Sequence, residues 1–283
     1  KRGGHQMSLT EFLTSNWSLT PWALILGASL SALYIIGSGY RLEKKSILFF
    51  SGVAIIIFSL VSPLDYLGRY YLFSAHMIQH ILLLLVAPLL MVLGLGETNT
   101  GKLLNMPLIG KALRKLTNPV LAWALGVGSM WIWHMPSLYE KALSSEVLYV
   151  SQQISFLLIG LIFWWPVFGS AQSRRLSPLT STLYLSSACL ACSILGMLIT
   201  FAGAGLYPAY LNPADAAGIL PYIRNELCIT PGADQQIGGL TMWVPGCMIY
   251  LAASMVTLVS WYSGDDEELE RLLRGTDTAK QTR

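Results

Sequence analysis

The chain has 283 residues, of which 54% are hydrophobic and only 12% are charged, and its formal net charge is +3. A typical soluble domain carries roughly 25% charged residues, so this composition excludes an ordinary soluble protein and indicates one that crosses a membrane several times. Residues 1–6 lack the pattern of a cleavable signal peptide, and a native start at Met7 would leave His5 without a role.

Long apolar windows define the expected fold. Each covers roughly 30 Å of hydrocarbon with about 20 residues, and 46–61 is the shortest. The seven windows are residues 21–40, 46–61, 70–95, 118–135, 147–168, 182–205 and 238–262. The sequence therefore predicts an all-α, polytopic bundle of seven transmembrane helices over residues 21–262. It is preceded by a periplasmic segment, 1–20, and followed by a cytoplasmic tail, 263–283, that is a short amphipathic helix or a frayed end.

The positive charges predict the orientation of this bundle. Alternate loops collect 13 of the 18 lysines and arginines on one side of the membrane: Arg41, Lys44, Lys45, Lys102, Lys111, Arg114, Lys115, Arg174, Arg175, Arg271, Arg274, Lys280 and Arg283. Cytoplasmic loops are the ones enriched in such residues. We therefore expect the N-terminus outside and the C-terminus in the cytoplasm.

Two histidines fall inside the third window, at positions 76 and 80. Residues four apart lie on one face of a helix, so His76 and His80 point the same way. An imidazole without a partner in hydrocarbon costs about several kcal/mol. The pair therefore requires a shared partner, which could be a polar helix face, a water-filled cavity or a metal.

A third histidine, His134, ends the fourth window and falls in the same outer half of the membrane. Imidazoles with methionines nearby suit copper better than magnesium or calcium, and zinc is the weaker alternative. Among the methionines we expect Met77 and Met135 to be the first ligands, since each neighbours a histidine. The alternative is that the histidines are hydrogen-bonded interior residues and the methionines fill the core.

Several polar residues could orient the histidine rings by accepting or donating hydrogen bonds behind them. Asp65 and Asp234 are the acidic candidates on the outer side, and Gln153 and Gln235 are the carboxamides. Asp65 could equally be a solvated loop charge.

The cysteines do not predict a disulfide framework. Cys189 and Cys192 are three residues apart among small residues, which favours close helix packing over redox or metal chemistry, and Cys247 has the same interpretation. Cys228 lies in an outer loop, where it could be a free thiol, a metal ligand or an intermolecular partner.

Several motifs occur in a fixed order between residues 62 and 262. They are FSAHMIQHILLLLVAPLLMVLG, WIWHMPSLYEKAL, FLLIGLIFWWPVFG, LGMLITF and ADQQIGGLTMWVPG. In this the chain resembles the CtaG family of integral-membrane cytochrome c oxidase assembly factors. The resemblance implies a seven-span protein of the bacterial cytoplasmic (inner) membrane that matures haem-copper oxidases, with a suspected role in copper delivery. The family's histidine motif falls on His76 and His80, its WxWH motif on His134, and its DQ motif on Asp234 and Gln235.

One departure from this family concerns the metal. Where many members carry a further histidine pair at the start of the fifth span, this chain has Tyr149 and Gln153. A degenerate site or a mainly structural member is therefore an open alternative.

Three functions remain possible at this point. In the first, His76, His80 and His134 hold copper(I), taken from a periplasmic copper donor, and pass it to an oxidase subunit. In the second, the chain is a structural accessory subunit or scaffold without metal. In the third, it is a transporter or redox protein that uses the histidines for protons, haem or quinone. We expect no enzyme, because no nucleophile lies beside a base and no phosphate loop is present, and we expect no nucleic-acid partner.

Overall fold

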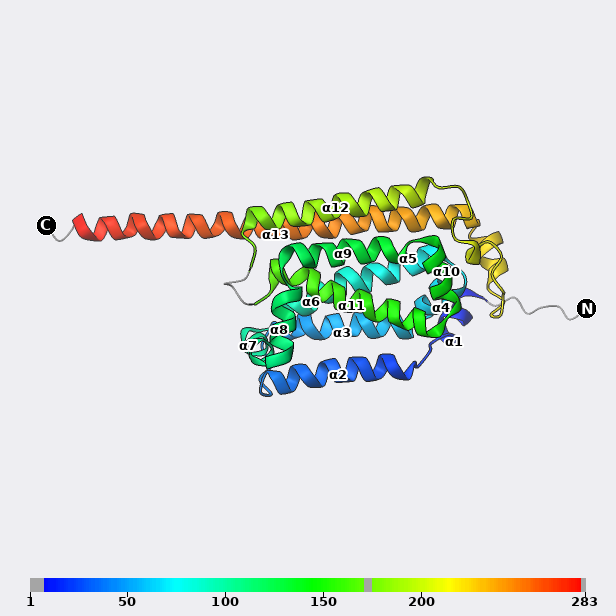
Figure 1. Ribbon diagram of the computed structural model, residues 1–283, viewed down its shortest axis with the longest axis horizontal. Helices are drawn as coiled ribbons and strands as arrows, with labels where there is room; N and C mark the ends of the chain where they lie inside the picture. The colour runs from blue at the N-terminus through cyan, green and yellow to red at the C-terminus, as the bar shows by residue number, and fades with distance from the viewer. Residues whose placement is uncertain (1–7, 171–174, 281–283) are drawn as a thin grey trace, which may run out of the picture.

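The computed structural model describes residues 8–170 and 175–280, with the side chains of 265–280 left out, and within these ranges it contains helices and no strand. The helices form an elongated bundle whose last helix projects far beyond one end (Figure 1). The predicted all-α class is confirmed. Lys1, Arg2, Arg174 and Arg283, which entered the charge count above, lie outside the described residues.

Within the described residues, four helical segments are long and apolar enough to cross a membrane, or five if the bent pair Ser46–Val61 and Pro63–Tyr70 forms one span. One, Phe73–Gly94, combines α5 (Phe73–Ile81), a π-helical turn η1 (Leu82–Val86) and α6 (Ala87–Gly94). The others are α11 (Glu146–Phe168), α12 (Pro178–Phe201) and the part Pro231–Gly264 of α13 (Pro231–Lys280). They correspond to four of the seven predicted windows.

The other three windows form helices that are shorter or bent. The helices α2 (Pro21–Gly37) and α9 (Pro119–Trp133) have 17 and 15 residues. The helix α3 (Ser46–Val61) meets α4 (Pro63–Tyr70) at a bend of 51°. Residues 62–69 lie between two predicted windows and were expected as a loop, but from Pro63 onward they are helical. Ser62 is extended and its side chain accepts from Leu64 N, while Pro63 starts the new helix.

Shorter elements cover the two ends of the bundle. The helices α7 (Glu97–Asn105) and α8 (Pro107–Leu116) lie at the end from which α13 projects (Figure 1). The opposite end carries α1 (Leu9–Ser15), α10 (Pro136–Ser144), the 3₁₀ turn η3 (Pro208–Tyr210) and the π-helical turn η4 (Tyr222–Glu226). After residue 262 the structure has no short separate helix, because α13 runs unbroken to Lys280.

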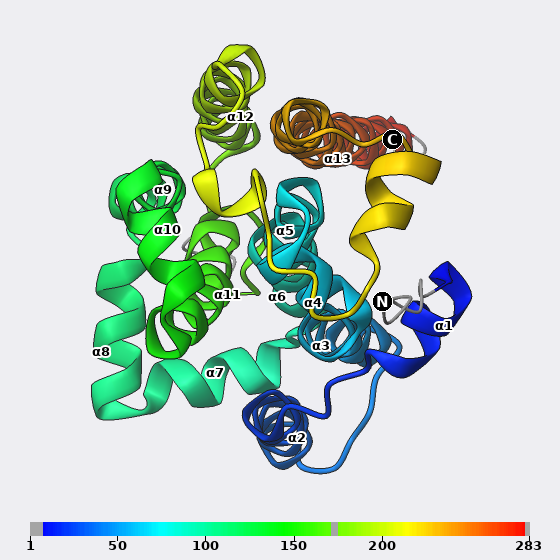
Figure 2. The same ribbon diagram turned by 90° about the vertical axis from the view of Figure 1, so that its right-hand side faces the viewer.

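The segment Phe73–Gly94 is the centre of the bundle, as the end-on view in Figure 2 shows. Its apolar window is 61% buried, compared with 28% for that of α13. The helices α3, α11 and α13 pack around it, and α12 packs mainly on α13. Most residues of this segment are therefore surrounded by protein rather than by lipid.

The hydrogen-bond ladder of this central segment is interrupted at Pro88. Proline has no N–H to donate, so the preceding turn widens into the π-helical residues Leu82–Val86. The neighbouring helix α11 covers the opened turn. Its Trp164 Nε1 donates to Leu85 O at 3.0 Å, and Gly160 lies against the Leu84 carbonyl. A tryptophan and a glycine one turn apart thus fit the break in the facing helix.

The N-terminus of α5 is capped from a distant part of the chain. Its own N-cap residue, Leu72, has no side chain able to bond the free amides. Asp234 on α13 supplies this bond instead, accepting from Phe73 N at 2.6 Å and from Ser74 N at 3.1 Å. A buried carboxylate at a helix N-terminus is also favoured by the helix dipole.

The cysteines differ from the sequence interpretation. Cys189 on α12 and Cys247 on α13 form a disulfide across the helix pair. The spacing of Cys189 and Cys192 suggested one shared packing role, but the two side chains diverge, and Cys192 is a buried free thiol. Cys228 is exposed, as expected for a loop residue.

The contact between α11 and the broken turn can be tested with one substitution at two glycines. A Cβ on Gly160 would lie 2.3 Å from Leu84 O and 2.6 Å from Pro88 Cγ, whereas a Cβ on Gly128 meets nothing within 4 Å. We expect Gly160→Ala to destabilise the protein by about 1–3 kcal/mol through overpacking. We expect Gly128→Ala to be neutral or stabilising by up to about 1 kcal/mol. Thermal unfolding in detergent measures both, and equal midpoints would contradict the packing.

The long-range cap can be tested at Asp234. Replacement by Ala leaves the buried amides of Phe73 and Ser74 without an acceptor, which should cost about 1–3 kcal/mol. Asp234→Asn keeps one acceptor oxygen, so this variant should lose clearly less stability than the Ala variant. The ranking of the two unfolding midpoints is the measurement. An Ala variant as stable as the unsubstituted protein would show that the cap contributes nothing.

Candidate functional site

Two imidazoles stack along the central helix. The ring centroids of His76 and His80 are 4.1 Å apart with an edge-on geometry, as expected for residues one turn apart. His76 is 0% exposed and His80 is 5% exposed. Phe156 of α11 covers His80 at a centroid distance of 4.3 Å. Both polar rings are therefore held in a protein interior made mostly of apolar groups.

The third histidine meets this pair from a different helix. His134 follows the last residue of α9, and its ring centroid lies 5.4 Å from that of His80. Its Nδ1 lies 2.6 Å from Met130 O, and its Nε2 lies 3.3 Å from Met77 Sδ. The bond to Met130 O fixes the ring, so that Nε2 is the nitrogen directed at the sulfur.

A small cavity lies beside these groups, between the central segment and the α12–α13 pair. Its volume is ≈ 20 Å³, which is room for about one water-sized occupant. The side chains in its wall that can donate an electron pair to a metal are Met77, His80, Met130, His134, Cys192 and Met242. Three thioethers, two imidazoles and one thiol are the donors that soft metals prefer.

The ring nitrogens of the stacked pair lack partners. Gly68 and Gln152 approach the His76 ring, but neither nitrogen of His76 or His80 completes a hydrogen bond within the described chain. Buried polar atoms without a partner are rare and point to an occupant such as water or an ion. The donor chemistry fits a soft metal, although no three His, Cys, Asp or Glu side chains in the described residues are already close enough to hold one.

Asp65 and Gln153, expected behind the histidines, belong to a neighbouring network. Its centre is Gln79, whose Nε2 donates to Asp65 Oδ1 at 2.7 Å. Tyr149 donates to the same carboxylate oxygen at 2.7 Å, and Gln153 Nε2 donates to Gln79 Oε1 at 3.3 Å. The ring of Tyr149 lies 6.0 Å from that of His76. The network therefore supports the wall beside His76 without a direct hydrogen bond to a histidine.

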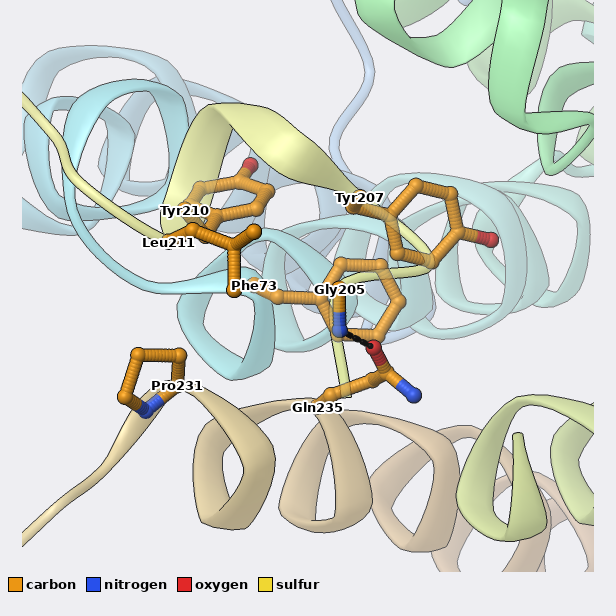
Figure 3. Close-up of a pocket in the computed structure, with 7 residues that line it drawn as sticks. All are labelled: Phe73, Gly205, Tyr207, Tyr210, Leu211, Pro231 and Gln235. Atoms are coloured by element: carbon orange, nitrogen blue, oxygen red, sulfur yellow. Dashed lines mark hydrogen bonds between the residues drawn. The ribbon is translucent and has the colours of Figure 1, made fainter. Parts of the chain in front are cut away.

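The DQ pair fastens helix ends and does not touch the histidine rings. Asp234 caps α5, the helix that carries His76 and His80. Gln235 Oε1 accepts from Gly205 N, as Figure 3 shows. It also accepts from Leu206 N, while Gln235 Nε2 donates to carbonyls at the end of α12. Asp234 thus fixes the start of the histidine helix, and Gln235 fixes the end of α12 and the turn after it, both through backbone groups.

A layer of tyrosines closes the site toward the end of the bundle. The Tyr139 ring lies 5.1 Å from His76, and Tyr207 donates to the His134 carbonyl at 2.9 Å. Tyr139 and Tyr210 share a hydrogen bond of 2.9 Å, and Tyr210 donates to Gly68 O. Burial raises the pKa of the Tyr139 and Tyr210 hydroxyls, so both stay protonated.

The two methionines named from the sequence lie in different environments. Met77 is 1% exposed and touches His134, so it belongs to the cluster. Met135 is 55% exposed and lines no part of the cavity. Met130, four residues before His134, and Met242 both line this cavity.

Residues 32–264 match the family described as cytochrome c oxidase caa3 assembly factor (Caa3_CtaG). An uncharacterised protein of Mycobacterium leprae is 24% identical over 222 residues, which are 73% of this chain and 32% of that protein. Uncharacterised proteins of Mycobacterium bovis and Mycobacterium tuberculosis are each 22% identical over 272 residues, 90% of this chain and 40% of theirs.

The chain thus spans between about a third and two fifths of the length of these curated relatives. No solved structure matches it. The family match takes in His76, His80 and His134 as well as the helices that pack around them. Because this match covers most of the chain, the protein belongs to the cytochrome c oxidase caa3 assembly factor family.

Proposed function

We propose that the protein crosses the bacterial cytoplasmic membrane seven times, with its N-terminus in the periplasm. Besides the four long spans, the helices α2, α3 with α4, and α9 supply three further apolar segments. The basic residues around α7 and α8 lie at the bundle end from which α13 projects (Figure 1). A basic end is favoured on the cytoplasmic side, which leaves the histidines in the periplasmic half.

We further propose that the protein serves the assembly of a haem-copper oxidase by holding copper(I) for transfer to an oxidase subunit. The observation that supports this most directly is the unsatisfied state of the His76 and His80 nitrogens, next to a cavity walled by His134 and Met77. In hydrocarbon such nitrogens require a partner, and copper(I) accepts two or three imidazole or thioether ligands.

Each part of the site would have a separate task. His80, His134 and Met77 border the cavity and would be the first ligands, while His76, whose ring contacts His80, would complete the set. Bound copper would supply a soft cation that moves by ligand exchange. The tyrosine layer would keep water away from it, and Asp234 would hold the histidine helix in place. A periplasmic donor would load the site, and none of these tasks requires an enzyme.

A scaffold without metal is the second candidate, and one observation favours it. Tyr149 and Gln153, which occupy the positions of a further histidine pair in many family members, are engaged with Asp65 and Gln79 instead of facing a metal. The part of the site that they would have contributed is thus a closed hydrogen-bond network. The protein would then bind oxidase subunits through its helices alone.

Metal analysis separates the two candidates. Protein purified and then loaded with copper(I) under reducing conditions should retain about one copper per chain, with little zinc. The double variant His76→Ala/His80→Ala should bind copper at least about tenfold more weakly, because even residues outside the ligand set change metal affinity by that factor.

Met135→Ala is the matched control, since its side chain is 55% exposed and outside the cavity wall. Copper content should be unchanged in this variant. If the double histidine variant kept its copper, the ligand assignment would be wrong. If neither protein bound copper while both still co-purified with oxidase subunits, the scaffold would be the correct function.

A further inference from the structure

The helix α8 runs in a different direction from the membrane spans. Figure 2 shows the bundle end-on, and α8 lies lengthwise in this view at the edge of the bundle, so its axis crosses those of the spanning helices. It lies at the bundle end from which α13 projects (Figure 1). A helix in this position is parallel to the membrane plane and close to the membrane surface.

Two adjoining sides of α8 differ in their chemistry. With about 3.6 residues per turn, residues three and four apart share one side of a helix. One side is basic and consists of three exposed residues, Lys111, Arg114 and Lys115. The next side is apolar and also consists of exposed residues, Leu108, Ile109 and Ala112. The helix contains no acidic residue that would interrupt either side.

The protein covers mainly a third side. Gly110 is buried, and a Cβ at this position would lie 2.1 Å from Leu104 O of α7. Leu113, three residues later, is half-buried against the core, and Arg114 donates to Leu104 O at 2.9 Å. Among the described elements α8 packs mainly on α7. The apolar side is thus left open.

The open sides leave α8 poorly supported by the protein alone. Leu108 is 87% exposed and Ile109 is 50% exposed, although side chains of this kind favour an apolar environment. Isolated helices shorter than about 12–15 residues are marginal in water, and α8 has ten residues. This helix therefore requires a further contact. At the membrane surface, lipid is the partner that reaches its outer sides.

The arrangement of these sides fits the boundary between acyl chains and water. Leu108 and Lys115 are seven residues apart, so they lie on one line along α8, where its apolar and basic sides meet. Helices in the membrane interface bury an apolar side among the acyl chains and keep lysines and arginines at the headgroups. Basic residues at this level attract anionic headgroups. Charge complementarity thus identifies the kind of lipid.

We propose that α8 lies in the headgroup layer of the leaflet at this end of the bundle and binds anionic phospholipid. Leu108 and Ile109 would enter the acyl chains, and Lys111 and Lys115 would meet the phosphates. Through α7 and α8 the chain passes from the central segment to α9. A lipid-bound α8 would therefore hold the ends of the two elements that carry the three histidines, and this role does not depend on copper.

Amide hydrogen exchange of residues 111–116 tests the proposal. The full chain is placed in nanodiscs of phosphatidylcholine, or of phosphatidylcholine and phosphatidylglycerol in equal parts. Exchange should be at least about tenfold slower with phosphatidylglycerol, since each lysine or arginine near an anionic surface contributes about 1 kcal/mol, or about fivefold. Salt at about 0.5 M should remove most of this difference by screening. Both leaflets have the same composition, so the result does not depend on the orientation of the bundle.

A pair of double variants makes the test specific to α8. Lys111→Gln/Lys115→Gln should reduce the difference between the two membranes by at least about fivefold, and glutamine keeps the helix propensity of lysine. Lys44→Gln/Lys45→Gln is the matched control. It removes two exposed charges from the segment between α2 and α3, and should change the difference by less than about twofold.

Four results would overturn the proposal. Equal exchange in the two membranes would show that α8 does not distinguish anionic from neutral lipid. An unchanged difference in Lys111→Gln/Lys115→Gln would exclude these lysines as the contact. An equal loss in the control would show a general attraction of the basic end. Fast exchange in both membranes, slowed only by an added oxidase subunit, would make α8 a docking helix for protein.

Discussion

The structure depends on one constraint, that every polar group inside an apolar bundle requires a partner within the protein. The central segment Phe73–Gly94 breaks the regular helix pattern twice, and a neighbour compensates each time. The free amides at its start bond to Asp234, and the turn opened by Pro88 is covered by Trp164 and Gly160. Within this segment, the buried side-chain atoms without a hydrogen-bond partner in the described residues are the ring nitrogens of His76 and His80. These two imidazoles are therefore the groups of the central segment for which an outside partner is most needed.

Periodicity and composition were sufficient to predict the parts of the fold that depend on local sequence. Spacing by four residues placed His76 and His80 on one helix face, and their rings are in contact. Hydropathy gave the positions of the long helices α11, α12 and α13. These features follow from helical geometry and from the length of an apolar run, and neither requires knowledge of which helices are neighbours.

The missed features depend on contacts between residues far apart in the chain. Asp234 caps a helix 160 residues away, and Cys189 bonds to Cys247 rather than serving the same purpose as Cys192. Both contacts depend on how α13 is aligned along its neighbouring helices, and a single sequence does not reveal this alignment. The same holds for Gln79, which was not singled out because its partners Asp65 and Tyr149 come from two other helices. The helix at 63–70 was missed because its polar residues looked like a loop, although Ser62 and Pro63 form a recognisable N-terminal cap.

The position of the cluster limits how an ion could leave it. On the side of the outer loops, Tyr139, Tyr207 and Tyr210 are all buried and bonded to backbone or to each other, so that layer would have to come apart for an ion to pass. On the other side the cavity wall is shared with Cys192 of α12 and Met242 of α13, and this helix pair packs at the outside of the bundle (Figure 2). Asp234, which caps α5, and Met242, which lines the cavity, both belong to α13. A movement of α13 that opened the cavity would therefore also pull on the N-terminus of the histidine helix. Release of an ion toward a membrane partner would thus be coupled to the hydrogen bonds between Asp234 and α5.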